Sequence, residues 1–99
     1  MLDELTHETF AGHVGDTFTI TAPDGDTIEL TLAEVTLAPE SYGVPGRRQP
    51  FSLTFHGPVS PYAPQATWAL EHPELEGLHL FLVPLGPEGD TMRYQAVFT

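Results

Sequence analysis

Short runs in which apolar and polar residues alternate, separated by clusters of Pro and Gly, dominate this sequence. Successive side chains of a strand point to opposite faces, so a period of two predicts a strand with one apolar face. Phe18 and Ile20 alternate with threonines in this way, and Pro23, Asp24 and Gly25 then supply a tight turn. Together with one continuous apolar run, the alternation predicts six strands, at about residues 16–22, 27–38, 50–56, 66–72, 78–85 and 92–98.

Two of the predicted strands are irregular. The apolar parity flips between Leu32 and Val35, which predicts a β-bulge near Ala33 and Glu34. Residues 78–85 are apolar at both parities, so we expect a central strand that is covered on both faces, with an N-terminal helix as a candidate cover.

That helix is predicted at about residues 6–12. Thr6 can cap its start, Glu8 lies in its first turn, and Gly12 or Gly15 can end it. The 99 residues suffice for a single domain, residues 1–99. One short N-terminal helix and six short strands joined by sequential turns predict a mainly β fold, a six-stranded antiparallel, meander-like barrel or a sandwich.

Charge excludes two classes of partner. The chain has 14 Asp and Glu residues and only three Lys and Arg, for a net charge of −11. Binding to nucleic acid or to an anionic membrane surface requires a basic face, so we expect neither. We expect the acidity to act mainly as a surface that resists random association.

The N-terminal five residues are acidic and lack the apolar run of a signal peptide. We therefore expect synthesis in the cytoplasm, with later incorporation into a secreted or particle assembly left open. The chain contains no Cys, which excludes disulfides and thiolate metal sites.

Motifs of catalysis are missing from the sequence. Its serines have no G-x-S-x-G setting, its histidines form no H-E-x-x-H motif, and no Gly-rich phosphate loop occurs. We therefore expect no catalytic residue, no cofactor and no enzymatic activity. A hydrolase that uses a pair of carboxylates is a third, less supported hypothesis.

Two histidines are candidates for a metal site. His72 and His79 flank one turn and could face each other across a hairpin, with Glu71, Glu74 and Glu76 nearby. Two imidazoles and a carboxylate can bind a divalent metal. The alternative, which the sequence favours, is that both are ordinary residues on a strand face.

Candidate interaction residues lie in the loops. Arg47 and Arg48 carry most of the scarce positive charge, in the long non-periodic stretch 38–49, and could contact an acidic patch on a protein partner or on a second copy. A solvated pair or an intrachain salt bridge is the favoured alternative. Tyr42 and Tyr62 also lie in loops and are candidates for an interface, whereas Trp68 on an alternating strand is expected in the core.

Segments across nearly the whole chain resemble a family of short bacterial domains of unknown function. The most distinctive are Glu71-His72-Pro73 and Phe81-Leu82-Val83-Pro84, and the others include Val14-Gly15-Asp16-Thr17-Phe18, Phe51-Ser52-Leu53-Thr54-Phe55 and Tyr94-Gln95-Ala96-Val97-Phe98. Ala63-Pro64-Gln65 departs slightly from the Leu-Pro-Gln of the family pattern. Members are often encoded beside proteins with phage-tail-collar-like domains, so the resemblance implies a component or accessory of a tail-like or fibrous surface assembly. It implies no activity, cofactor or catalytic residue.

The preferred hypothesis is therefore a non-enzymatic structural or protein-interaction domain. The alternative is a small β-barrel that binds a small ligand in an aromatic-lined interior, or a divalent metal at the His72/His79 turn.

Overall fold

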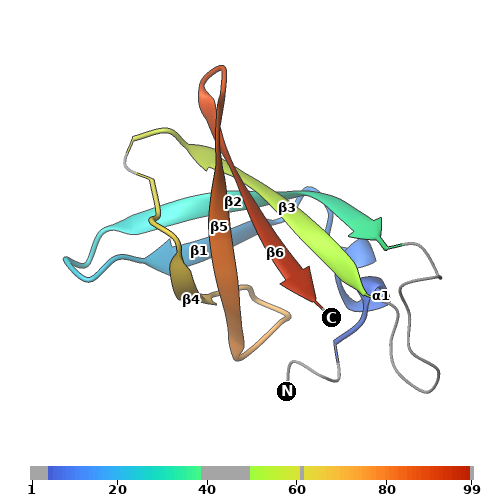
Figure 1. Ribbon diagram of the computed structural model, residues 1–99. Coiled ribbons are helices and arrows are strands. Elements are labelled where there is room, and N and C mark those ends of the chain that lie inside the picture. The colour runs from blue at the N-terminus through green and yellow to red at the C-terminus, as the bar shows by residue number, and fades with distance from the viewer. Residues whose placement is uncertain (1–4, 39–49, 61, 99) are drawn as a thin grey trace.

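The computed structural model describes residues 5–38, 50–60 and 62–98 (Figure 1). One short helix, α1 (His7–Ala11), precedes the strands. The strands of this described part are β1 (Thr17–Thr21), β2 (Thr27–Leu37), β3 (Phe51–Pro58), β4 (Ala66–Leu70), β5 (Leu78–Glu88) and β6 (Thr91–Phe98).

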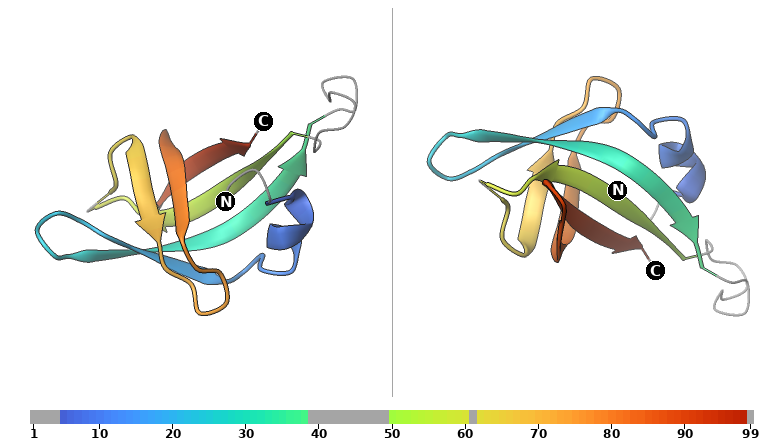
Figure 2. Two further views of the ribbon diagram at one scale, coloured as in Figure 1. Left: turned by 90° about the horizontal axis from the view of Figure 1, so that it is seen from below. Right: turned by 90° about the horizontal axis from the view of Figure 1, so that it is seen from above.

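The six strands form one antiparallel sheet in the order β1-β2-β3-β6-β5-β4. The sheet curls until its two outer strands meet, and Figure 2 shows β4 and β5 crossing over β1 and β2. Thr19 and Glu71 make the closing contact, an isolated bridge in which each N–H donates to the other residue's carbonyl oxygen, at 3.0 and 2.8 Å. The predicted mainly β fold is confirmed, in the form of a nearly closed barrel.

The strand order corrects the expectation of a meander. β3 pairs with β6 rather than with β4, its successor in the sequence. The β4–β5 hairpin is therefore placed on the far side of β6, where it can reach β1. This arrangement brings the turn after β4 beside the turn before β1.

Helix α1 closes one end of the barrel, next to β2 (Figure 2). Phe10 is fully buried, and its ring lies 6.0 Å from that of Phe51 and 5.6 Å from that of Phe98. The rings of Phe51 and Phe98, which are paired across β3 and β6, are stacked at 4.5 Å. This aromatic group stabilises a helix too short to persist alone.

The bulge in β2 is confirmed. Its pairing with β3 shifts register between Leu32 and Glu34, so the extra residue is Ala33. The shift keeps Leu32 and Val35 on the inward side, where Leu32 is fully buried and Val35 packs against the core.

The expected double cover of residues 78–85 is wrong. Leu78, Leu80 and Leu82 are buried, but Phe81 between them is 52% exposed. A closed barrel has a single interior, so the second face of each strand turns to solvent unless another element covers it. Helix α1 packs at the barrel end and leaves this face of β5 open.

Strand β5 also continues beyond its predicted end. Pro84, which lacks an N–H, is tolerated because the pairing of β5 with β6 shifts register between Pro84 and Gly86. Leu85 is the extra residue at this second bulge, and the strand then runs on to Glu88.

Candidate functional site

Of the four predicted interaction residues, the structure describes Tyr62. Arg47, Arg48 and Tyr42 lie outside the described residues. Tyr62 is exposed in the connection between β3 and β4. Trp68, expected in the core, is half-buried against it and donates its indole N–H to the carbonyl of Pro64 at 3.0 Å.

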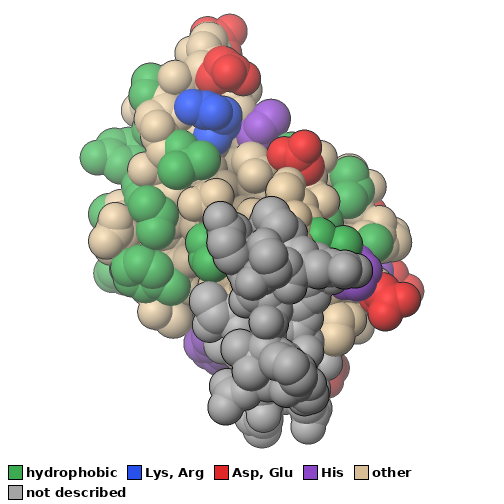
Figure 3. Space-filling view, turned by 45° about the vertical axis from the view of Figure 1, so that its right-hand side comes forward, with side chains coloured by type: hydrophobic (Ala, Val, Ile, Leu, Met, Phe, Trp, Pro, Cys, Tyr) green, Lys and Arg blue, Asp and Glu red, His purple; other side chains and the backbone are tan. Residues whose placement is uncertain are grey.

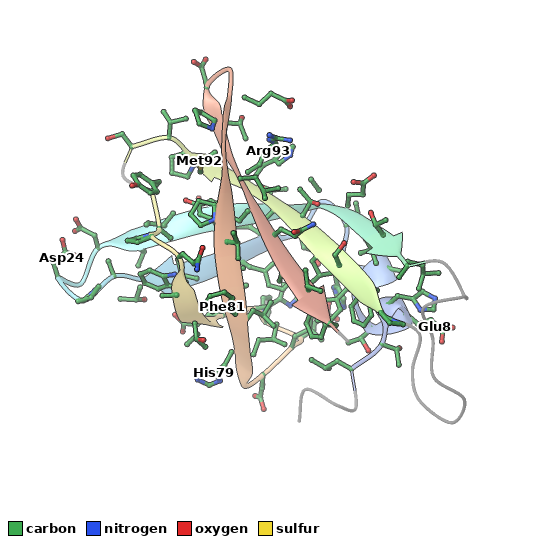
Figure 4. All side chains as sticks on the ribbon, in the orientation of Figure 1. Glu8, Asp24, His79, Phe81, Met92 and Arg93 are labelled. Carbon is green, nitrogen blue, oxygen red and sulfur yellow. The ribbon has the colours of Figure 1, made fainter. Side chains whose placement is uncertain are left out.

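His72 and His79 are not brought together as a ligand pair. The hairpin register sets His79 opposite Ala69, and the exposed ring projects from β5, with Nδ1 3.3 Å from the carbonyl of Gly77 (Figure 4). His72 follows β4 past the closing bridge and meets a different set of residues.

Those residues form a cluster at the barrel seam: His13, Asp16, His72 and Glu74. Nδ1 of His13 and Nε2 of His72 each lie 2.9 Å from the same Oδ2 of Asp16. Oε1 of Glu74 lies 3.9 Å from Nδ1 of His13. One potential ligand atom from each of the four residues lies within 4.8 Å of the others.

Local structure positions each half of this seam cluster. The chain turns after α1 at Gly15, whose φ of 96° is rarely open to other residues. The N–H of Gly15 donates to the carbonyl of Leu32 at 2.7 Å, and the N–H of Leu32 donates to the carbonyl of Asp16 at 3.0 Å. These two bonds fix the turn against β2 and present His13 and Asp16 at the seam.

The other half is fixed by the bend after β4. The His72 side chain is only 3% exposed, and its ring lies 4.6 Å from that of Phe18 and 4.8 Å from that of His13. Its Nδ1 accepts a hydrogen bond from the N–H of Glu74 at 3.0 Å. In the neutral ring the proton is therefore on Nε2, which donates to Asp16.

Asp16 thus accepts hydrogen bonds from two imidazoles. These bonds, from His13 first and from His72 second, hold the pKa of the Asp16 carboxyl below its ordinary value. The carboxylate is the central acceptor of the cluster, and both rings are oriented by it.

Sequence reasoning missed His13 and Asp16 as partners of His72. They are separated from it by more than fifty residues, and no spacing motif connects them. The cluster arises only because the sheet curls and β1 meets the end of β4, which the alternation pattern does not encode.

A second feature is a sheet face that is poor in acidic residues, with Glu88 at the far end of β5 as its acidic member among the described residues. We call it the β3–β6–β5 face, and its outward residues are Ser52, Thr54 and His56 of β3, Arg93, Gln95 and Val97 of β6, and His79, Phe81 and Val83 of β5. Val97 is 63% exposed and Phe81 52%. Val83 pairs with Gln95 on the antiparallel neighbour. Phe81 and Val97 are each two residues further from the β5–β6 turn, so they lie next to each other on the same face.

Apart from Glu88 at the end of β5, the acidic side chains of the described residues lie around this face rather than on it. Figure 4 places Asp24 at the tip of the β1–β2 hairpin and Glu8 on α1, at opposite ends of the molecule. In Figure 3 hydrophobic side chains gather on one side of the view, whereas acidic ones are dispersed over the remainder, one of them next to the blue Arg side chain.

Arg93 provides the positive charge of the face. It stands on β6 between His56 of β3 and Gly86 of β5. Its buried Nε has no hydrogen-bond partner within the described part of the chain. Arg93 also forms no ion pair with the described acidic residues.

The described chain contains no helix of the length and apolarity that crossing a membrane requires.

Comparison with known proteins identifies a family but no characterised relative. Residues 5–98 match the model of a family described as a domain of unknown function, DUF6916. The match confirms the resemblance to a short domain of unknown function. No curated protein and no solved structure matches the chain.

Proposed function

The chain belongs to the DUF6916 family of domains of unknown function, and we propose that it acts as a non-enzymatic structural or protein-interaction domain whose β3–β6–β5 face docks on a protein partner. The observation that carries the proposal is the composition of this face. It combines exposed Phe81 and Val97 with a single acidic residue among the described positions of the three strands, Glu88 at the end of β5, in a chain with a net charge of −11.

Contiguous exposed apolar side chains are costly on a soluble protein unless they are used for binding. Phe81 and Val97 are extended by half-buried Val83 and by Leu85, which is 42% exposed at the β5 bulge. An aromatic anchor with aliphatic neighbours is the usual centre of a protein interface. The surrounding acidic residues keep the rest of the surface from associating at random.

Arg93 defines the chemistry of the partner. A guanidinium without a carboxylate partner among the described residues, next to an apolar patch, suits a carboxylate presented by another protein. We therefore assign the face to a partner with apolar side chains and at least one carboxylate. Two copies of this chain would repel each other because each has a net charge of −11. We therefore propose a different protein as the partner.

The resemblance to bacterial domains encoded beside phage-tail-collar-like proteins supports a subunit of a tail-like or fibrous assembly as that partner. In this scheme the protein is made in the cytoplasm and becomes part of the particle there. Arg47, Arg48, Tyr42 and Tyr62 remain candidates for further contacts. The scheme assigns no role to nucleic acid or membrane.

The alternative of a ligand-binding barrel interior has less support. Eighteen described residues, nearly all of them aliphatic or Phe, are buried in the core, and the hydroxyl of Tyr94 is already satisfied there by the N–H of Ala63. Such an interior has the character of a packed core rather than of a pocket with orienting polar groups.

The test begins with photo-crosslinking from position 97 in cells that encode the protein, with position 59 as the control site. Val59 is also exposed but lies in the loop after β3. The protein crosslinked from position 97 is identified, purified and titrated against the full chain by calorimetry. We expect Phe81→Asp and Val97→Asp to abolish the binding heat and Val59→Asp to retain it.

Sedimentation velocity of the chain alone completes the test. A monomer over a range of concentrations is expected. Binding that survives both Phe81→Asp and Val97→Asp would contradict the proposal. So would a dimer weakened by these substitutions, because the face would then serve a second copy.

A further inference from the structure

We propose that the seam cluster is a zinc(II) site, with Nδ1 of His13, Oδ2 of Asp16, Nε2 of His72 and Oε1 of Glu74 as its four ligands. This inference is independent of the proposed interaction face, which lies on other strands.

The spacing of the four atoms suits a small tetrahedral ion. Zinc binds imidazole nitrogen and carboxylate oxygen at about 2.0–2.2 Å, which puts neighbouring ligand atoms about 3.3 Å apart. Here Oδ2 of Asp16 lies 2.9 Å from each imidazole nitrogen, and Oε1 of Glu74 lies 3.9 Å from His13. Because all four atoms lie within 4.8 Å of one another, they can reach a common centre through small shifts of the side chains and of the bend that carries Glu74.

The chemistry of the donors selects the metal. Two imidazole nitrogens with two carboxylate oxygens favour zinc and related transition metals, whereas calcium and magnesium prefer oxygen ligands alone. The two carboxylates offset the charge of a divalent ion. In a chain without Cys, this is the kind of closed zinc site that remains available.

Half of the site is already held in place. His72 is packed against Phe18 and 3% exposed, and His13 is 19% exposed, so neither ring has to be ordered from solution. An open groove of about 510 Å³, lined by Thr17, Thr19, Glu71, His72 and Pro73, gives solvent access beside His72.

Binding requires each neutral ring to move its single proton to the other nitrogen. In His13 the proton passes from Nδ1 to Nε2. In His72 it passes from Nε2 to Nδ1, so the hydrogen bond from the N–H of Glu74 must open. Glu74 lies in an exposed bend, with its side chain 72% exposed, so the bend can shift and bring its carboxylate onto the metal.

The ion would join the two edges of the sheet. His13 and Asp16 precede β1, and His72 and Glu74 follow β4, while backbone pairing of these strands consists of the single bridge between Thr19 and Glu71. We therefore expect zinc to raise the melting temperature of the protein as well as to bind.

Cobalt(II) is the spectroscopic probe, because it replaces zinc and absorbs strongly in the visible range when its site is tetrahedral. Tag-free full-length protein is titrated with cobalt and then with zinc as a competitor. We expect tetrahedral visible bands that zinc removes, and a higher melting temperature with zinc. His13→Gln and Glu74→Gln should lose or weaken the bands.

The matched controls are His79→Gln and Glu76→Gln, an exposed His and an exposed Glu outside the cluster. Both should retain the bands and the thermal shift. The Glu74 and Glu76 variants alter exposed side chains, so their folds should persist, and circular dichroism verifies this. An absence of tetrahedral bands in the wild type, or bands that persist equally in His13→Gln and Glu74→Gln, would overturn the assignment.

Discussion

Nε2 of His72 donates a hydrogen bond to Oδ2 of Asp16 at 2.9 Å, across the seam where the two edge strands of the sheet, β1 and β4, meet. Because His13 donates to the same oxygen, a single carboxylate connects the turn before β1 with the bend after β4. The contact therefore has a structural role even without a metal ion.

We expect Asp16→Asn to lower the free energy of unfolding in EDTA at neutral pH. The amide oxygen can still accept, but two hydrogen bonds to a charged acceptor become weaker neutral ones. The matched control is Asp24→Asn, which removes the same charge in the exposed β1–β2 turn. Comparing the free energies of unfolding of the two variants in urea distinguishes the loss of the hydrogen bonds from the effect of removing one negative charge. Equal stability of the two variants would remove the structural role of Asp16.

Tyr94→Phe should cost about 1–3 kcal/mol of unfolding free energy. The hydroxyl of fully buried Tyr94 accepts a hydrogen bond from the N–H of buried Ala63 at 2.8 Å, and the substitution leaves that N–H unpaired. Tyr62→Phe, at an exposed position, should be close to neutral in the same urea titration. A loss below about 0.5 kcal/mol at Tyr94 would show that water replaces the hydroxyl.

Tyr94 should also make stability depend on alkaline pH. Burial raises the pKa of its hydroxyl above the ordinary value of 10.0. The neutral form is thus favoured in the folded state, and its contribution is complete below pH 10 and lost as the pH rises through the raised pKa. The chain has no Lys, so few other groups titrate in this range. We expect the melting temperature to fall more steeply between pH 9.5 and about 11.5 in the wild type than in Tyr94→Phe.

Gly57→Ala should destabilise the barrel by about 1–3 kcal/mol through overpacking. A Cβ at Gly57 would lie 2.6 Å from Cδ2 of Leu30 and 3.4 Å from Cε1 of Tyr94, and both side chains are fully buried. The control is Gly12→Ala, where a Cβ meets no atom within 4 Å and φ is negative. Thermal melting of the two variants tests the difference, and similar melting temperatures would mean that Leu30 can move aside freely.

Phe10→Ala should cost about 3–5 kcal/mol, because it leaves a cavity where the Phe10 ring packs against both Phe51 and Phe98 at the barrel end. The short α1 has little other support. Val14→Ala changes an exposed side chain and should be nearly neutral. Urea unfolding measures both. A cost below about 1 kcal/mol for Phe10→Ala would show that packing of the helix on the barrel end contributes little to stability.

Local patterns in the sequence predicted the strands and the first bulge well. The alternation around Phe18, Leu30 and Leu53 reflects one buried face, and the parity change at Ala33 can be read without knowing which strands pair. The double cover of β5 was wrong for a complementary reason. Phe81 and Val83 are apolar at outward positions, and no pattern in the sequence distinguishes a covered apolar face from an exposed one.

The seam cluster could not be predicted, because its members meet only through strand order. Sequence proximity pairs His72 with His79 as candidate ligands, whereas its neighbours in space are His13 and Asp16. Pairing of β3 with β6 instead of β4 decides this, and that choice depends on packing across the whole sheet.

The bridge between Thr19 and Glu71 gives the barrel a point of local opening. Continuous ladders join all five pairs of neighbouring strands in the sheet. By contrast, the edge strands β1 and β4 are joined by the two backbone hydrogen bonds between Thr19 and Glu71. We expect opening at this bridge to require less free energy than global unfolding, so the amide protons of Thr19 and Glu71 should exchange with solvent before those in the middle of β3 and β6. The barrel is a single sheet closed at one bridge, so β1 and β4 can separate there while all five strand pairings of the sheet stay intact.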